Sequence, residues 1–585
     1  MKDSRDLATR FDVILRFVHI YFGQNYLFLS LNSVNFSSVK PRHSSINDTL
    51  DFGSPQNAFL SSLTSIIRRG LGNRTRAVTV LHSSSTSRPT SQAHPSTPDV
   101  IFIGIIHNLQ HAFHLVDHGP SADEQDQVAL EQFRDFWGDK SELRRFKDGR
   151  IVECVVWEVT TADEMAHVPS MIVRHLLKRH FNIDEGDVET WQTSFDSVLR
   201  LPQSISQEYL ASKISTGFKG ALTAFDDLVK AIKKLDDDLP LTLLSISPAS
   251  EFLRYASVFS PVPLSRTLAA LLPENAQYLA PMDIIIEFEK SSKWPDDLKA
   301  IQTIKLAFFE RLASALMESV DGLKANVVVG DGVHMSDIVD KACLEIITPD
   351  GWAFSAHIWH DREVNLLDRI ISGNGDLPHI VVKNKMNKKS PEYFEALEAK
   401  QIYLRRFIHA PRHHRAIAAL HHHYAAFSGT VRLVKRWLAS HWLLQSHISE
   451  EVVELICASF FIDGRASVVD MDTEQSSQHL VPGSKERGFS AVVQFLKEWK
   501  WEDGLVVPLY GLPPASLSDV STPLVSNVVH KGVWRVFTEH DREGHVWTCN
   551  GPDLVVAHRV RSLADATWNC LQTLERAQID IKVRF

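Results

Sequence analysis

The residues best suited to chemistry stand in a helical stretch between positions 393 and 461. His409 and His413 are four residues apart, a spacing at which two imidazoles on one helix face can share a metal ion. No cysteine or acidic side chain stands at ligand spacing from them, and four arginines surround them: Arg405, Arg406, Arg412 and Arg415. Because neighbouring cations disfavour a bound cation, we expect no metal site here. We expect a basic helix surface instead, which is either solvated or faces RNA.

A second group of cations follows in the segment 430–444. Val434, Trp437 and Leu438 form an apolar stripe on this predicted helix. Arg432, Lys435 and Arg436 lie at i, i+3 and i+4 on the opposite face of this helix. We expect their charged ends to face solvent. This face is either an ordinary solvated surface or a contact for a phosphate backbone. The second interpretation gives seven candidate RNA-binding residues: Arg405, Arg406, Arg412, Arg415, Arg432, Lys435 and Arg436.

The segment 136–150 is the densest in aromatic, charged and glycine residues. It reads FWGDKSELRRFKDGR, and its Asp-Gly turn leads into a predicted strand. It could bind an anion through Arg144, Arg145 and Lys147, or it could be a structural corner in which Arg145 pairs with Glu142 and Phe146 is buried. We expect one of the two adjacent arginines to be structural, paired with Glu142 or Glu153, and the other to be exposed. The motif residues are Trp137, Gly138, Glu142, Arg144, Arg145, Asp148 and Gly149.

Composition excludes several functional classes. The chain has 585 residues, and 62 basic against 71 acidic side chains give it a net charge of −9, so any RNA contact must come from local basic patches. Its five cysteines include no C-x-x-C pair, which favours a reducing compartment. The start resembles no signal peptide, and polar residues interrupt the apolar stretch 13–31, so we expect a soluble intracellular protein without a membrane span. The motifs G-x-S-x-G, H-E-x-x-H and the Walker A loop do not occur.

The hydrophobic pattern predicts an α+β protein of several domains. Up to about residue 365, predicted strands (100–106, 151–160, 282–289, 342–347 and 353–358) alternate with predicted helices (171–181, 223–235 and 300–317). Residues 393–461 read as almost purely helical. Strands return at 534–538 and 546–548, and a helix follows at 562–574.

Several segments, in the same order along the chain, closely resemble the Nrap family of nucleolar RNA-associated proteins. They are HLVDHGP (114–120), FWGDKSELRRFKDGRIVECVVW (136–157), SISPASEFLRYASVF (245–259), FEKSSKWPDDLKAIQTIK (288–305), HDRE (360–363), VRLVKRWLASHWL (431–443) and EEVVELICASFF (450–461). The resemblance covers most of the chain beyond about residue 60. It implies two tandem modules, each with a nucleotidyltransferase-like domain, a helical domain like that of poly(A) polymerase and oligoadenylate synthase, and an α/β tail domain.

By this resemblance the chain holds only part of the family's architecture. Residues 1–9 are unassigned. The tail domain of the first module (domain 3-like) is expected at 10–198, the nucleotidyltransferase-like domain (domain 4-like) at 199–370, the helical domain (domain 5-like) at 371–528, and a truncated tail domain (domain 6-like) at 529–585. The catalytic-like and helical domains of the first module are missing, so the chain resembles a fragment.

The residues that nucleotidyl transfer requires are not at the expected positions. Active members of the fold place Gly-Ser on a turn, two carboxylates one residue apart on the next strand, and a third carboxylate beyond them, to hold two metal ions. The turn here is Ser245–Ser250, without glycine and with Pro248, and the segment Tyr255–Phe259 expected to carry the pair has no acid. Asp283 and Glu345 stand on later strands, but isolated carboxylates do not hold two metals. We therefore expect a pseudoenzyme without catalytic residues, cofactor or small-molecule substrate.

The family resemblance implies a nuclear, nucleolar setting in the small-subunit processome. The implied partners are pre-ribosomal RNA, snoRNP and processome proteins, and the implied role is a non-catalytic scaffold in rRNA processing and ribosome biogenesis. Two alternatives stay open: a protein-only adaptor without RNA contact, and an active RNA nucleotidyltransferase.

Overall fold

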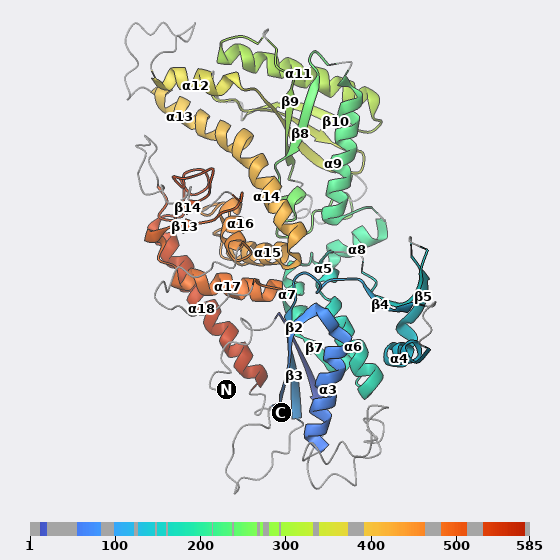
Figure 1. Ribbon diagram of the computed structural model, residues 1–585. Coiled ribbons are helices and arrows are strands. Elements are labelled where there is room, and N and C mark those ends of the chain that lie inside the picture. The colour runs from blue at the N-terminus through green and yellow to red at the C-terminus, as the bar shows by residue number, and fades with distance from the viewer. Residues whose placement is uncertain are drawn as a thin grey trace.

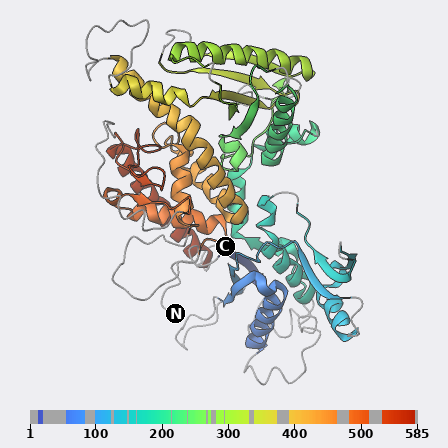
Figure 2. The same cartoon turned by 45° about the horizontal axis from the view of Figure 1, so that its top comes forward.

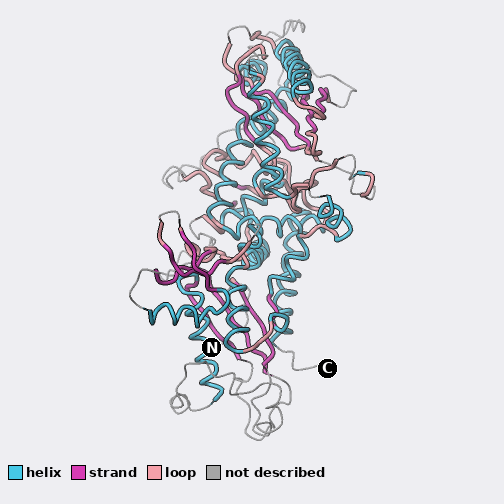
Figure 3. Tube along the Cα trace, turned by 90° about the vertical axis from the view of Figure 1, so that its right-hand side faces the viewer, coloured by secondary structure: helices cyan, strands magenta, loops and turns pink. Residues whose placement is uncertain are grey.

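The computed structural model arranges the chain as three packed units (Figure 1). We call them the N-terminal unit (12–199), the central unit (217–372) and the helical unit (391–579). Figure 2 shows the helical unit standing between the two α/β units, and Figure 3 shows strands in the upper and lower parts of the molecule with helices between them. The structure describes residues 12–19, 55–82, 99–121, 127–146, 149–159, 162–212, 214–236, 239–265, 269–272, 280–291, 294–330, 338–372, 391–462, 481–511 and 531–579.

The N-terminal unit contains two antiparallel sheets. The first has the order β2-β3-β1-β7, and the helices α3 and α6 pack against each other in its core. The second has the order β4-β6-β5 and lies beside α4. The strands are β1 (Val13–His19), β2 (Thr75–His82), β3 (Asp99–His107), β4 (Val116–Ser121), β5 (Ser141–Arg145), β6 (Ile151–Val156) and β7 (Val188–Thr190). The helices are α3 (Pro55–Leu71), α4 (Gln127–Trp137), α5 (Ala162–Met165), α6 (Val168–Phe181) and α7 (Trp191–Leu199), and α8 (Gln203–Ser212) leads out of the unit.

The central unit is one mixed sheet with helices on it. The sheet order is β10-β11-β12-β9-β8, and only the pair β12–β9 is parallel. Isoleucines on β9 favour the extended conformation, and Asp297 begins the longest helix of the unit by accepting from the amide of Ala300 at 3.0 Å. The elements are α9 (Gly217–Lys234), β8 (Leu243–Pro248), β9 (Met282–Phe288), α11 (Leu298–Ser319), β10 (Lys324–Val329), β11 (Ala342–Ile347), β12 (Ala353–Trp359) and α12 (Arg362–Ser372), with the short turn η6 (Glu251–Arg254) after β8.

The helical unit is connected to the central unit by a nearly continuous helical run. It consists of α13 (Pro391–Tyr403), the π-helical turn η8 (Leu404–His409) and α14 (Ala410–His423), which descends diagonally in Figure 1. Tyr403 and Phe407 belong to the core of the central unit, whereas Ile417 belongs to the core of the helical unit. The remaining elements are α15 (Ala425–Ser440), α16 (Glu450–Ser459), α17 (Lys485–Glu498), α18 (Leu554–Ile579) and the short strands β13 (Leu505–Val506) and β14 (Val536–Phe537).

The α+β class and most predicted elements are confirmed, and one predicted strand is wrong. Residues 546–548 form turns, because the carboxylate of Asp541 accepts from the amides of His545 and Val546 and closes the chain on itself. Residues Trp534 to Leu571 contribute to the same core as α15–α17. The family-domain boundaries at 198, 370 and 528 stay predictions. Within the described residues, no helix combines the length and apolarity needed to span a bilayer.

Candidate functional site

The turn after β8 is occupied by the protein's own hydrogen bonds. Pro248, the last residue of β8, lies opposite Ile284 and has no amide hydrogen to offer a phosphate. The amide of Ala249 donates to the carbonyl oxygen of Asp283 at 3.0 Å. The hydroxyl of Ser250 accepts from the amide of Phe252 at 3.3 Å and caps η6. Ala249 is therefore engaged in a hydrogen bond to β9 and Ser250 in the cap of η6, and Pro248 has no amide hydrogen to donate to a ligand.

The strand after this turn is β9, so our placement of the carboxylate strand at 255–259 is wrong. Those residues form a turn and bends, and Tyr255 has a φ of +59°. On β9, alternation places Asp283, Ile285 and Glu287 on one face. Two carboxylates one residue apart therefore do not occur, because Ile285 separates the two acids. Asp283 and Glu287 are about 13 Å apart along the strand, several times the separation of about 4 Å in a two-metal site.

Asp283 and Glu345 share a row that crosses the sheet but do not meet. Ser355 on β12 lies opposite Asp283, and Glu345 on β11 lies opposite Ser355, so two strand spacings of about 4.8 Å separate the acids. Nε2 of His357 is 3.7 Å from Asp283, whose side chain is 61% exposed. Within the described ranges, no three His, Cys, Asp or Glu side chains are grouped so as to hold a metal ion. The geometry offers Asp283 alone where nucleotidyl transfer needs a cluster.

The prediction that the charged ends of Arg432 and Lys435 face solvent is wrong. Arg432 is 2% exposed; its Nε donates to the carbonyl oxygen of Val258 at 3.2 Å, and its guanidinium lies over the ring of Phe218 at 5.2 Å. Lys435 is fully buried. The physical reason is that α15 is covered on every side, with twelve of its sixteen residues buried. On the face opposite the apolar stripe, Arg432 packs against the central unit and Lys435 packs against α16, so neither charged end meets water.

Lys435 belongs to a buried ionic network that joins the central and helical units. Its Nζ lies 2.7 Å from Glu450 and 2.7 Å from Glu454 of α16. Glu454 also accepts hydrogen bonds from Nε and Nη2 of Arg254, at 2.9 and 3.0 Å. Its carboxylate lies 2.6 Å from Nε2 of His413. Burial alone would raise the pKa of Glu454, but the charges of Arg254 and Lys435 hold that pKa well below its usual value.

This buried ionic network is not predicted from the sequence, although the acidic residues of α16 could have indicated it. Glu450 and Glu454 stand four residues apart in the helix EEVVELICAS, whose other residues apart from Glu451 and Ser459 are apolar. An acid on a buried helix face requires a cationic partner, and the basic face of α15 provides one.

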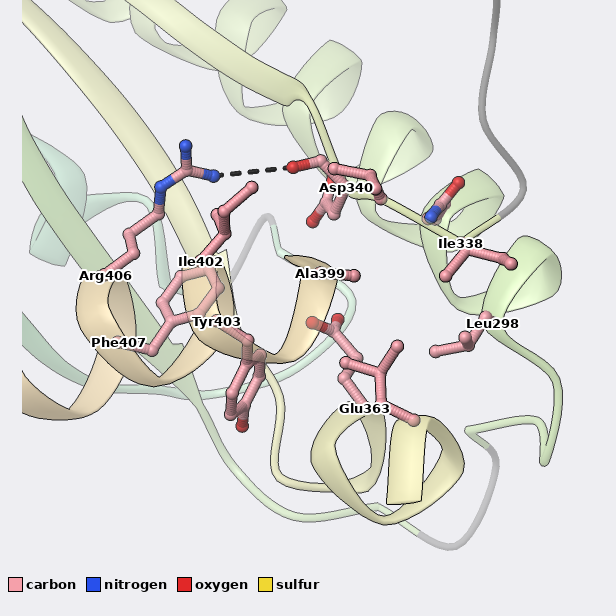
Figure 4. A pocket seen from close by; sticks show the side chains of 12 residues that line it. Leu298, Ile338, Asp340, Glu363, Ala399, Ile402, Tyr403, Arg406 and Phe407 are labelled. Atoms are coloured by element: carbon pink, nitrogen blue, oxygen red, sulfur yellow. Dashed lines mark hydrogen bonds between the residues drawn. The ribbon is translucent and has the colours of Figure 1, made fainter. Parts of the chain in front are cut away.

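Arg406 is also directed into the protein. Figure 4 shows its Nη1 donating to the carbonyl oxygen of Asp340 at 3.4 Å, at the edge of a cavity of about 20 Å³. The fully buried Lys305 pairs beside this cavity with Asp340, at 2.8 Å, and with Glu363. Burial raises the pKa of Glu363 to about 6, with Lys305 opposing the shift. We interpret this cluster as structural, because the cavity has room for about one water molecule.

Three of the seven candidate cations present exposed side chains. Arg405 pairs with Glu451 at 3.3 Å and lies over the ring of Trp547, yet stays 45% exposed. Arg412 and Arg415 are exposed on α14. Arg436 is half-buried, with its guanidinium 5.2 Å from the ring centre of Phe259. RNA contact by these residues stays a prediction.

The tryptophan-glycine motif lies at the end of α4 and is held by α6. Three successive carbonyl oxygens, those of Asp135, Phe136 and Trp137, each face a side chain of α6: Nη2 of Arg179 at 2.8 Å, Nε2 of His180 at 3.1 Å and Nε2 of His175 at 3.0 Å. These contacts satisfy helix-end carbonyls that lack intrahelical partners. Trp137 is buried against Trp157, and Gly138 has a φ of +59°. This half of the motif is a structural corner.

The hairpin half of the motif corrects our expectation for its arginines. The predicted turn is present, with Gly149 at a φ of +87°, while Asp148 lies outside the described residues. Arg144 pairs with Glu142 at 2.6 Å, but both side chains are about half exposed, and Arg145 is exposed as well. Neither arginine forms a buried pair. Glu153, 3% exposed, pairs instead with Arg134 of α4 and accepts from Ser141 at 2.7 Å.

A cavity of about 460 Å³ opens between the central and helical units. Its wall combines backbone and side chains of 257–262 with the loop 442–446, and Glu251 and Glu450 border it. Trp442, 86% exposed, stands at its edge with a φ of +61°. The geometry therefore provides a second concave site, whose ionisable border is acidic.

Comparison with known proteins gives matches along nearly the whole chain. Three models of one family match consecutive segments: Nrap protein domain 3 at 9–182, Nrap protein nucleotidyltransferase domain 4 at 194–422, and Nrap protein PAP/OAS1-like domain 5 at 424–585. The last match includes the segment where we expect a separate tail domain. The domain 4 match spans the five-stranded central sheet and extends through α13 into α14, and the domain 5 match begins just before α15.

Curated relatives extend well beyond the length of this chain. U3 small nucleolar RNA-associated protein 22 of Schizosaccharomyces pombe is 30% identical over 533 residues, which are 88% of this chain and 43% of that protein. Nucleolar protein 6 of Xenopus laevis is 28% identical over 547 residues, 90% of this chain and 43% of that protein. The chain thus spans less than half the length of these relatives.

Among solved structures, one described as "Structural Basis for the Activity of a Cytoplasmic RNA Terminal U-transferase" is similar with a TM-score of 0.30 and 11% identity, over 65% of this chain and 92% of that one. The family matches to domains 3, 4 and 5, which follow one another in this order along the sequence, establish that this chain belongs to the Nrap family.

Proposed function

We propose that the chain is a non-catalytic scaffold in the nucleolar small-subunit processome, where it contributes to rRNA processing and ribosome biogenesis. The observation that carries the non-catalytic part is the isolation of Asp283. Ile285 stands where a second carboxylate is needed, and Ser355 lies on the neighbouring strand. The names of the relatives, which include "nucleolar" and "U3 small nucleolar RNA-associated", support the nucleolar setting and an association with small nucleolar RNA. Pre-ribosomal RNA, snoRNP and processome proteins are the partners that we propose.

Labelled nucleotide incorporation tests catalytic silence. The full chain is incubated with an RNA primer, each labelled NTP and either Mg²⁺ or Mn²⁺, beside the variant Asp283→Ala. We expect no incorporation above background in either protein, because one carboxylate cannot clamp the attacking and leaving oxygens. Metal-dependent incorporation that disappears in Asp283→Ala would establish the active transferase instead. The proposal involves no cofactor, small-molecule substrate or membrane.

The proposed RNA contact rests on the cations that stay exposed, Arg405, Arg412 and Arg415. They lie on η8 and α14, and His422 and His423 at the end of α14 are exposed too. Phosphate contacts by such residues position an RNA without reading its sequence. The protein-only adaptor is the second candidate, and the burial of Arg432 and Lys435 favours it, because it removes two of the seven cations from the surface.

A further inference from the structure

The cavity between the central and helical units has an unbalanced acidic border. Glu450 is engaged, with Lys435 at 2.7 Å and Nε2 of Gln445 at 2.6 Å. Glu251 borders the cavity and, among the described residues, has no hydrogen bond or ion pair with another side chain. Burial, together with the nearby charge of Glu450, raises the pKa of Glu251 to about 7. A carboxylate in this position is stabilised by any cation that enters the cavity.

One acid of this border lacks a basic partner of its own. The carboxylates of Glu251, Glu450 and Glu454 are grouped with Arg254 and Lys435, while Arg432 and Arg436 contact the wall residues Val258 and Phe259. Arg254 and Glu454 satisfy each other in a bidentate pair, and Arg405 is 3.3 Å from Glu451. Among the described residues, Glu251 is therefore the acid of this group that no basic side chain pairs, and a cation that enters the cavity would favour its ionised form.

The edge of the cavity adds an aromatic surface. Trp442 has a left-handed backbone conformation that is rare for a bulky residue, and the residue is 86% exposed. An exposed indole face attracts a guanidinium, and Trp is the strongest aromatic partner for one. Most of the remaining wall is apolar, including Phe252, Val258 and Met282. Such a wall suits the aliphatic stem of a long basic side chain and its apolar neighbours.

We propose that this cavity binds the arginine side chain of an extended segment of a protein partner, with the guanidinium at Glu251 and the adjoining residues against Trp442. The inference rests on the proposed scaffold function and specifies the chemistry of one partner. An arginine is preferred over a lysine, because a planar guanidinium can donate two parallel hydrogen bonds to the carboxylate of Glu251.

Peptide binding to the full chain tests the inference. The probe is a fluorescein-labelled seven-residue peptide with a central arginine between two leucines, and its partner peptide has the neutral isostere citrulline in place of arginine. Fluorescence anisotropy measures both. We expect the arginine peptide to bind at least about tenfold more tightly, as for a hydrogen bond to a charged group. Glu251→Gln should abolish this preference, and Trp442→Ala should weaken binding of the arginine peptide.

Matched controls separate this result from unfolding and from surface attraction. Glu345→Gln removes an exposed acid from β11, and Phe394→Ala removes an aromatic ring on α13 that is 57% exposed; both should bind the arginine peptide like the wild type. Because Trp442 is mostly exposed, its variant should keep the thermal midpoint of the wild type. Equal binding of the two peptides, no binding of either, or displacement of the peptide by a short oligouridylate overturns the inference. None of these results bears on nucleotide incorporation, so the non-catalytic proposal is judged separately.

Discussion

Arg254 of the central unit and Glu454 of the helical unit, 200 residues apart in sequence, form a bidentate ion pair in which both partners are nearly inaccessible to solvent. Nη1 of Arg254 also donates to the carbonyl oxygen of Ala249 at 2.6 Å, in the turn after β8 where the resemblance places the glycine and serine of an active nucleotidyltransferase. Lys435 and His413 complete the coordination of the same carboxylate. The residues after this turn therefore serve to fix the helical unit to the sheet, a role that suits a scaffold.

Removal of one partner of this pair should destabilise the chain strongly. We expect Arg254→Ala to lower the free energy of unfolding by about 3–5 kcal/mol, because Glu454 is left buried with one cation fewer. Arg405→Ala breaks the ion pair with Glu451, in which the arginine side chain is 45% exposed. This substitution should change the free energy of unfolding by less than about 1 kcal/mol. Urea denaturation followed by circular dichroism measures both. Equal, small losses would show that the Arg254–Glu454 pair is not structural.

The basic side chains of α15 show where sequence reasoning ends. Periodicity located this helix and its apolar stripe of Val434, Trp437 and Leu438 correctly. It could not tell whether the opposite face meets water or another domain, because a charged side chain is compatible with either. Only the position of α16, with Glu450 and Glu454, makes Lys435 a buried residue.

The sequence pattern located the strand β9 but not its role as the strand that follows the turn after β8. The strand 282–289 was predicted within one residue of its bounds, and so were 342–347 and 353–358. The expected position of the carboxylate pair at 255–259 was wrong, because the turn after β8 leads into an irregular segment before β9 begins. The conclusion that a second carboxylate is missing holds on β9 as well, since Ile285 stands two residues after Asp283.

If α14 contacts RNA, its exposed arginines should set the salt dependence of binding. We expect the double variant Arg412→Gln, Arg415→Gln to flatten the log–log salt slope by about 1.4–1.8, since each neutralised phosphate contributes about 0.7–0.9. Folding should be unaffected, because both side chains are exposed. Filter binding of a structured RNA between low and moderate salt measures the slope.

The matched control for this experiment is Lys230→Gln on α9, a lysine that is 70% exposed and lies in the central unit. Its slope should equal that of the wild type. If the double arginine variant also keeps the wild-type slope, α14 is an ordinary solvated surface and the protein-only adaptor is favoured.

The hairpin of β5 and β6 provides a comparison of two arginines at different sites. Arg134→Ala should destabilise the N-terminal unit by about 1.5–3 kcal/mol, because it leaves the buried Glu153 without its charged partner. Arg144→Ala should change stability by less than about 1 kcal/mol, because its pair with Glu142 is half exposed. Thermal unfolding of the two variants measures the difference. A larger effect of Arg144→Ala would restore the structural role that we expected for the hairpin arginines.

Acid should weaken the contact between the N-terminal and helical units at Asp196. This carboxylate lies 3.0 Å from Nε2 of His167 and pairs with Lys485 of α17. Burial opposes the shift, but the hydrogen bond from His167 and the charge of Lys485 lower the pKa of Asp196 to about 2. A carboxyl with a lowered pKa in the folded state stabilises the protein above its unfolded pKa of about 4, and this stabilisation is lost as the pH falls towards 2.

We therefore expect Asp196→Asn to lower the free energy of unfolding by about 2 kcal/mol at pH 6 and to leave a smaller difference from the wild type at pH 3. Urea midpoints of both proteins at the two pH values measure this convergence. Asp227→Asn, at a pair whose partners are more than 60% exposed, is the control and should follow the wild type at both pH values. A constant difference between Asp196→Asn and the wild type from pH 6 to pH 3 would show that Asp196 acts by packing and not by charge, because a stabilisation that comes from the ionised carboxylate must shrink as the pH falls below its unfolded pKa.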